Sequence, residues 1–151
     1  MPLSIRQAGL ADAAVVVEFN QRLAEESEAK TLDVQLLARG VEAGLADPHK
    51  SVYFLAEEDG KAVGQIMYTT EWSDWRNGWF WWIQSVYVRR EARRRGVFRA
   101  LFEHLAKAAQ ADRNVIGLRL YVEHQNHVAQ QTYQKMGLIP AGYEVFERYP
   151  L

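Results

Sequence analysis

The sequence predicts an α/β fold in which a mixed, mostly antiparallel sheet is flanked by helices. Stretches rich in β-branched and aromatic residues are interspersed with stretches of helical periodicity. Two turn pairs, Asp59-Gly60 and Asn77-Gly78, join consecutive strands as hairpins. The second half alternates strand and helix, which is typical of an α/β chain. The 151 residues, 48% of them hydrophobic, suffice for one domain over residues 1–151, with no linker or repeat.

The first half supplies six of the expected elements. A short strand covers residues 3–8. A helix over 12–26 follows the start signals Gly9 and Asp12, and a second helix over 32–45 ends at Asp47-Pro48. Strands are expected over 51–57, 61–70 and 79–88, where β-prone residues flank the two turn pairs. In the last of these, strict alternation places Trp81 and Tyr87 on one face and Trp82 and Val86 on the other.

The second half supplies the other four. A helix over 96–111 carries Val97, Leu101, Leu105 and Ala108 on one side. Residues 115–122 are nearly all apolar or β-prone, so we expect a central strand. A helix over 126–136 ends at Gly137, and residues 139–147 form the last strand. The predicted order is β-α-α-β-β-β-α-β-α-β.

The segment Arg89–Arg99 concentrates the positive charge of the chain. It holds six arginines and one glutamate, a net +5 in a chain of net charge −1, so the other residues sum to −6. A basic nucleic-acid-binding domain is therefore not indicated. The segment joins a strand to a helix and contains Gly96, and backbone N–H groups at a helix N-terminus bind phosphate groups. The Gly-Lys-Ser/Thr ending of a nucleoside-triphosphate loop is absent.

Two motifs resemble the GNAT superfamily of acetyl-CoA-dependent N-acetyltransferases. Residues 93–98, Arg-Arg-Arg-Gly-Val-Phe, are similar to the family's Arg/Gln-x-x-Gly-x-Gly/Ala motif. Residues 126–138 are similar to its Asn-x-x-Ala-x-x-x-Tyr-x-x-x-Gly-Phe helix. The predicted element order also resembles a GNAT fold from residue 3 to residue 147. The region around the second hairpin is loosely similar to the diamine (spermidine/spermine-type) branch.

The resemblance implies roles for particular residues. The pyrophosphate of acetyl-CoA would be held at Arg93, Arg94, Arg95, Gly96, Val97, Phe98 and Arg99, mainly by the backbone amides of Arg94 to Arg99. The pantetheine arm would lie along Val86, Tyr87 and Val88 and pair with Val86 and Val88. Asn126 and Ala129 would lie beside the arm. A backbone N–H near Val86 would stabilise the oxyanion, and Tyr133 would protonate the leaving thiolate.

Two positions depart from the family pattern. Phe98 stands where the family has glycine or alanine, so either its ring points into the core or the pyrophosphate is displaced toward the arginine side chains. Gln84 stands where the diamine branch has a glutamate base. The candidates that replace it are Glu71, Asp74, or a water held by Gln84 and Ser85, because an alkyl ammonium must lose a proton before it attacks.

The implied function is acetyl transfer to a primary amine, by direct attack in a ternary complex. The acceptor is a small, polyamine-like amine or an exposed peptide or lysine amine. Trp72 and Trp75 could line its pocket, and the acidic run Glu25, Glu26 and Glu28 could attract its cation. Two alternatives stay open: a module that binds acetyl-CoA without turnover, and a nucleic-acid-binding domain that uses Arg89–Arg99.

Composition bounds the remaining properties. The chain has no cysteine, which excludes disulfides and thiolate chemistry. His124 and His127 have no supporting carboxylate cluster, so no metal site is expected. No signal peptide or transmembrane run is recognised, so a cytoplasmic protein without nucleic-acid or membrane partners is expected. The resemblance also suggests a homodimer through the late strands.

Overall fold

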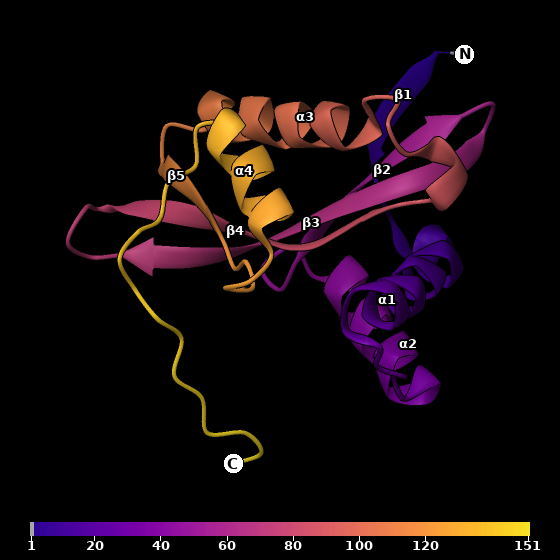
Figure 1. Cartoon of the computed structure of the whole chain (residues 1–151), viewed down its shortest axis with the longest axis horizontal. Helices are drawn as coiled ribbons and strands as arrows, with labels where there is room; N and C mark the ends of the chain where they lie inside the picture. Colours follow the sequence, from indigo (N-terminus) through magenta and orange to yellow (C-terminus); the bar gives the residue numbers. More distant parts are fainter. Residues whose placement is uncertain (1) are drawn as a thin grey trace. The chain divides into compact units, whose positions relative to one another are not determined.

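The computed structural model describes residues 2–151 and contains two compact units, one ending at Leu120 and one spanning Tyr121–Leu151. The first unit is a five-stranded sheet with helices on both faces (Figure 1). Its strands, in spatial as well as chain order, are β1 (Leu3–Gln7), β2 (Val52–Glu58), β3 (Lys61–Ser73), β4 (Gly78–Val88) and β5 (Val115–Leu120). β1 to β4 pair antiparallel, and β4 pairs parallel with β5. The predicted mixed, mostly antiparallel sheet is confirmed.

Three helices of the first unit cover the sheet. They are α1 (Ala13–Glu28), α2 (Val34–Ala46) and α3 (Val97–Ala111). Phe19 of α1 packs in a core cluster with Tyr53 and Leu55, whereas Phe54 packs edge-on against His104 of α3 at 4.8 Å. Because neighbouring residues of a strand point to opposite faces, α1 and α3 lie on opposite sides of the sheet, as Figure 1 shows.

Local sequence signals account for the element boundaries. The Asp33 side chain accepts hydrogen bonds from the backbone N–H groups of Gln35 and Leu36 at 3.1 Å and so caps α2. Both predicted hairpin turns are present, with left-handed backbone at Asp59 (φ 52°) and Asn77 (φ 51°). None of the helices in the described residues is long and apolar enough to cross a membrane.

A β-bulge in β4 overturns one prediction about faces. Met67 pairs with Ser85 but Tyr68 pairs with Ile83, so Gln84 is an extra residue in β4. Before the bulge, Trp81 stacks on Tyr68 at 3.8 Å, on the α3 face. After it, Tyr87 packs on Phe19 of α1 at 5.3 Å. The expectation that Trp81 and Tyr87 share a face is therefore wrong, because strict alternation fails across a bulge.

The second unit contains α4 (His127–Lys135) and a C-terminal segment without regular structure. Gly137 adopts φ +91° just after the helix, as the sequence predicts. The expected strand over 139–147 is wrong: those residues are described, but they join no ladder. A strand requires a hydrogen-bonding partner. β5 likewise ends at Leu120 and lies at an edge of the described sheet instead of its centre.

Candidate active site

The candidate site begins at an open edge of β4. β5 pairs with β4 from Trp79 to Ile83 and stops there, at the bulge. From Gln84 to Val88, the side of β4 that faces β5 has no strand partner among residues 2–151. This unpaired stretch includes Val86 and Val88, the residues that the family resemblance pairs with the pantetheine arm.

Backbone direction shows which groups face the open edge. The N–H of Arg89 donates to the carbonyl of Val63 on β3 at 2.8 Å. Because backbone groups of successive strand residues point to opposite sides, the N–H and C=O groups of Val86 and Val88 point away from β3, toward the open edge. The Nε–H of Arg93 confirms this for Val88, since it donates to that carbonyl at 2.9 Å.

The open edge leads into a tight strand-to-helix turn. After β4 comes a short 3-10 helix, Arg90–Ala92, and then two residues with left-handed backbone, Arg94 (φ 62°) and Gly96 (φ 81°). α3 begins at Val97, and Ala100 N–H donates to the Gly96 carbonyl at 3.0 Å. Backbone N–H groups in a first helical turn have no intrahelical acceptor and carry partial positive charge. The turn therefore has the geometry of an anion site.

Most arginine side chains of the turn are already paired with the protein's own carboxylates. The ion pairs are Arg89–Glu18 at 3.1 Å, Arg90–Glu26 at 3.4 Å, Arg93–Glu26 at 2.6 Å, Arg95–Glu58 at 3.3 Å and Arg99–Glu103 at 3.1 Å. Arg94 has no ion pair with a described residue. These pairs reduce the excess charge that an extended nucleic-acid backbone would meet.

A cavity of about 400 Å³ lies along the open edge. Its lining comprises Leu23, Glu26, Ser27, Val86, Tyr87, Val88, Arg93 and Phe98. The cavity thus joins five predicted cofactor residues, Val86, Tyr87, Val88, Arg93 and Phe98, with the C-terminal part of α1. Phe98 is half-buried, its ring lies 6.2 Å from that of Phe102, and it lines the cavity. The Phe98 side chain is therefore part of the cavity wall and is not fully buried in the core.

Glu26 is a part of this cavity whose role the sequence analysis missed. Its carboxylate accepts a hydrogen bond from the Tyr87 hydroxyl at 2.6 Å and another from Arg93 Nη2 at 2.6 Å. These two bonds, with Arg93 and Arg90 nearby, lower the pKa of Glu26 to about 2. Burial, followed by the bond to Glu26, raises the pKa of Tyr87. The acidic run suggested attraction of a substrate cation, whereas Glu26 binds the chain's own arginines.

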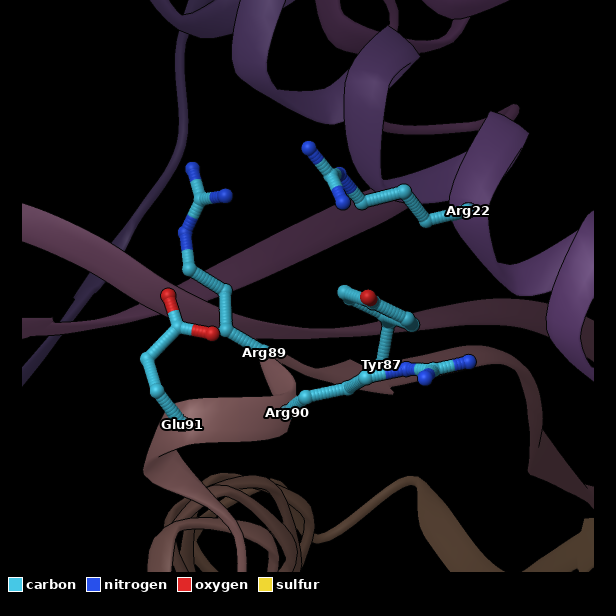
Figure 2. Close-up of a pocket in the computed structure, with 5 residues that line it drawn as sticks. All are labelled: Arg22, Tyr87, Arg89, Arg90 and Glu91. Atoms are coloured by element: carbon cyan, nitrogen blue, oxygen red, sulfur yellow. The ribbon is translucent and has the colours of Figure 1, made fainter.

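A second cavity, of about 240 Å³, lies on the α1 side of Tyr87 and is lined by Arg22, Tyr87, Arg89, Arg90 and Glu91 (Figure 2). Arg89 is fully engaged there, because its guanidinium meets the Glu18 carboxylate through two nitrogens and its Nε donates to the Ala62 carbonyl at 2.9 Å. Arg22 extends from α1 above the Tyr87 ring in the view of Figure 2.

The base candidates lie on β3, on β4 and in the turn between them, outside both cavities. Glu71 Oε1 accepts from Arg119 at 2.7 Å and from Trp82 Nε1 at 3.2 Å. Gln84 donates through Nε2 to Thr69 Oγ1 at 3.0 Å. Asp74 is in the hairpin turn, where its side chain accepts the Trp75 N–H at 2.9 Å. The structure thus holds Glu71 in a polar cluster with Arg119 and Trp82.

The hairpin tryptophans differ in their surroundings. Trp72 packs edge-on against Trp79 at 5.1 Å, and both are partly exposed. Trp75, in the turn, is 85% exposed. Neither Trp72 nor Trp75 lines the cavity at the open edge.

The second unit carries the other predicted site residues. Asn126 caps α4, because its side chain accepts the N–H of Ala129 at 3.1 Å. Burial raises the pKa of Tyr133, which is half-buried on the same helix. No group of three or more metal-ligating side chains occurs in the described part of the chain, His124 and His127 included.

The profile of the acetyltransferase (GNAT) family matches residues 16–138. A possible acetyltransferase from Clostridium difficile 630 has 43% identity and a TM-score of 0.94, covering 100% of this chain and 99% of its own. No curated protein sequence matches at a significant level.

More distant solved structures share the fold. A ribosomal-protein-alanine N-acetyltransferase from Brucella melitensis biovar Abortus 2308 has 18% identity and a TM-score of 0.80, with 98% and 99% of the two chains covered. An aminoglycoside N-acetyltransferase in complex with CoA has 16% identity and a TM-score of 0.81, with 99% and 96% covered. The profile match and the 43% identical structure show that the chain belongs to the acetyltransferase (GNAT) family, and it is an acyl-transferring enzyme.

Proposed function

We propose that the protein transfers the acetyl group of acetyl-CoA to a primary amine, directly and in a ternary complex. The observation that carries this proposal is the open edge of β4, which runs straight into the turn at Arg94 and Gly96. An extended amide-bearing arm fits an unpaired strand edge, and a pyrophosphate fits the first turn of a helix. The two fits occur in the order in which these groups occur in acetyl-CoA.

The residues present fit the donor in chemical terms. Val86 and Val88 offer N–H and C=O groups at the open edge, and the amides of Arg94 to Arg99 offer donors to phosphate oxygens. In this arrangement the Val86 N–H would donate to the acetyl oxygen as negative charge develops on it. Phe98, in the first turn of α3, lines the same cavity. The Tyr87 side chain lies on the α1 face of the sheet, where its hydroxyl donates a hydrogen bond to Glu26.

Tyr133 is proposed as the general acid toward the leaving thiolate. Its pKa is raised by burial above the ordinary value of 10, so its hydroxyl remains protonated at neutral pH. A proton donor must hold its proton until the thiolate leaves. Asn126 and Ala129, on the same helix, are proposed to contact the arm of the donor.

Glu71 is proposed as the group that accepts the ammonium proton, directly or through water. Gln84 cannot act as a base, and its amide is held by Thr69. Arg119 and Trp82 orient the Glu71 carboxylate through Oε1, and the side chain remains 45% exposed. Both the strand register and these bonds hold the carboxylate on the surface shared by β3 and β4.

The acceptor is proposed to be a small or polyamine-like amine, or an exposed peptide or lysine amine. Distant relatives of the fold include an enzyme named for a ribosomal protein's alanine and others named for aminoglycosides. These acceptors differ widely in size. The Glu71 side chain is 45% exposed, so either class of acceptor could reach it.

Three properties of the whole protein complete the proposal. We propose a single catalytic domain over residues 1–151, because the family profile spans both compact units. We propose a cytoplasmic location, where acetyl-CoA is made and used. We also propose a homodimer, because Tyr143, Val145 and Phe146 are 72%, 66% and 90% exposed in a strand-prone segment that forms no ladder.

A second candidate function is acetyl-CoA binding without turnover. It is favoured by Gln84 at the expected base position and by Phe98 at the border of the cavity. The amine screen that distinguishes the two functions measures free CoA thiol released from acetyl-CoA. Thiol release with at least one amine supports transfer, and acetyl-CoA binding with no release from any amine supports the binding module.

A thermal-shift experiment tests the donor assignment itself. A ligand at about 100 times its Kd adds about 2.7 kcal/mol to the free energy of unfolding. Acetyl-CoA is therefore expected to raise the Tm. An unchanged Tm, together with salt-sensitive binding of DNA or RNA, would instead support use of Arg89–Arg99 on nucleic acid.

A further inference from the structure

Arg93 lies across the open edge of β4 and is held at two points. Its Nε–H donates to the Val88 carbonyl at 2.9 Å, and its Nη2 donates to Glu26 at 2.6 Å. Its guanidinium also lies 5.5 Å from the centre of the Tyr87 ring. The side chain nevertheless remains 43% exposed, so it can leave these partners without disturbing the core.

This arrangement occupies an acceptor that a bound arm would use. The Val88 carbonyl is one of the backbone groups that point from β4 to the open edge, and pairing along Val86–Val88 requires a donor to that carbonyl. Arg93 supplies the donor in the structure. Arg93 also directly precedes Arg94–Arg99, the residues whose backbone amides are proposed to bind the pyrophosphate.

Glu26 is the residue that keeps Arg93 there. Its carboxylate is itself oriented by the Tyr87 hydroxyl at 2.6 Å, and its side chain is 19% exposed. With a pKa of about 2, it is fully ionised at neutral pH. A charge-assisted hydrogen bond to a fixed carboxylate is stronger than a neutral one. Glu26 therefore couples α1 to the arginine turn.

We propose that Glu26 is a positioning residue that sets the affinity for the acetyl donor. Glu26 holds Arg93 on the edge of β4, and Arg93 exchanges the Val88 carbonyl and Glu26 for pyrophosphate oxygens when the donor binds. This inference rests on the proposed function. It predicts that the negative charge at position 26, although it lies in the binding cavity, opposes binding.

The direction of the effect follows from charge and from competition. Glu26→Gln keeps the size of the side chain but replaces a charged partner of Arg93 with a neutral one. It also leaves Arg90 and Arg93 without the carboxylate that they share. Both changes favour a polyanionic ligand, so we expect the Kd for acetyl-CoA to fall about fivefold to tenfold.

Glu18→Gln is a matched control on the same helix. Glu18 is paired with Arg89 through two hydrogen bonds of 3.1 Å and lines neither cavity. Its replacement removes the same charge and a comparable ion pair, but it leaves Arg93 and the Val88 carbonyl untouched. Isothermal titration calorimetry with acetyl-CoA, at one ionic strength, is expected to show a Kd within about twofold of wild type for Glu18→Gln.

The outcomes separate this inference from the proposed function. Wild-type protein that does not bind acetyl-CoA would remove the proposed function. If the wild type binds acetyl-CoA and Glu26→Gln binds it with the same or a lower affinity, only the role of Glu26 would be overturned. An equal decrease in the Kd for acetyl-CoA in Glu26→Gln and Glu18→Gln would also overturn that role, because the effect would then come from the overall charge of the protein.

A second measurement follows Arg93 in the wild-type protein and does not require the Glu26→Gln variant to fold. The Arg93 Nε–H resonance, assigned by its loss in Arg93→Lys, is expected to exchange slowly with solvent when no ligand is present. Titration with acetyl-CoA is expected to shift this resonance. Fast exchange without ligand, or a resonance that does not respond to acetyl-CoA, would contradict the exchange of partners.

Discussion

At the scale of single residues, the roles proposed for titratable side chains follow from their immediate neighbours. Tyr133 has its pKa raised by burial, and Glu26 has its pKa lowered by Tyr87 and Arg93. The first is suited to donating a proton at neutral pH, and the second remains an anion. Sequence alone could single out Tyr133 because the resemblance includes it. Glu26 could not be assigned, because its partners lie more than sixty positions away.

The role of Tyr133 predicts a split between turnover and binding. Tyr133→Phe removes the proton donor and keeps the ring, so kcat is expected to fall about 100-fold while the Kd for acetyl-CoA stays within about twofold. Steady-state kinetics and calorimetry measure the two quantities. Tyr149→Phe is the matched control, since Tyr149 is 86% exposed and has no proposed role. Equal kcat values for Tyr133→Phe and wild type would remove the assignment.

The lowered pKa of Glu26 predicts a pH-dependent contribution to stability. A carboxyl group with a folded pKa of about 2 and an ordinary value of 4.5 stabilises the fold above pH 4.5, and loses that contribution as pH falls toward 2. The difference in unfolding free energy between wild type and Glu26→Gln is therefore expected to narrow between pH 4.5 and pH 2. Urea titrations at several pH values measure it, and a difference independent of pH would contradict the assigned ion pairs.

At the scale of elements, periodicity predicted the helices and strands up to α4, but one extra residue changed the site. Residues 79–88 form the expected strand, yet the bulge at Gln84 reverses which face Tyr87 and Val86 occupy. A bulge depends on pairing with β3, which composition does not reveal. The prediction of a last strand was wrong for a related reason. Residues 139–147 have a β-prone composition, but they have no strand partner among the described residues.

The turn between β4 and α3 makes a prediction about Gly96. Its φ of +81° is accessible to glycine at little cost, and a Cβ there would meet no atom within 4 Å. Gly96→Ala is therefore expected to cost about 1–2 kcal/mol of unfolding free energy through backbone strain alone, and to weaken acetyl-CoA binding. Gly9→Ala is the control, because Gly9 has equal space and an extended backbone. Chemical denaturation measures both variants, and an equal loss of unfolding free energy in Gly96→Ala and Gly9→Ala would contradict backbone strain at Gly96.

At the scale of the whole molecule, the family was recognisable from two short motifs and the order of elements. Both motifs lie where the chain turns into a helix, and such turns constrain residue type more than strands do. The C-terminal segment was less predictable, since its β-prone residues pair with no strand in the described part of the chain. Tyr143, Val145, Phe146 and Tyr149 are all exposed.

The proposed homodimer predicts an effect at Val145. Analytical ultracentrifugation of the wild type is expected to give the mass of two 17.4-kDa chains. Val145→Pro removes a backbone donor from the strand-prone segment and is expected to shift the protein to monomer, whereas Val145→Thr keeps the β-branched shape and the donor. A monomeric wild type would remove the proposal, and a dimeric Val145→Pro would place the interface elsewhere.

The crowding of tryptophan into the β3–β4 hairpin has a consequence for spectroscopy. All five tryptophans lie between Trp72 and Trp82, so intrinsic fluorescence reports on this hairpin and its surroundings. Far-UV circular dichroism, in contrast, reports the helices of both units. Coincident unfolding curves from the two methods would show that the hairpin and the helices unfold together. Residues 121–151 contain no tryptophan, so the emission comes entirely from residues of the first unit.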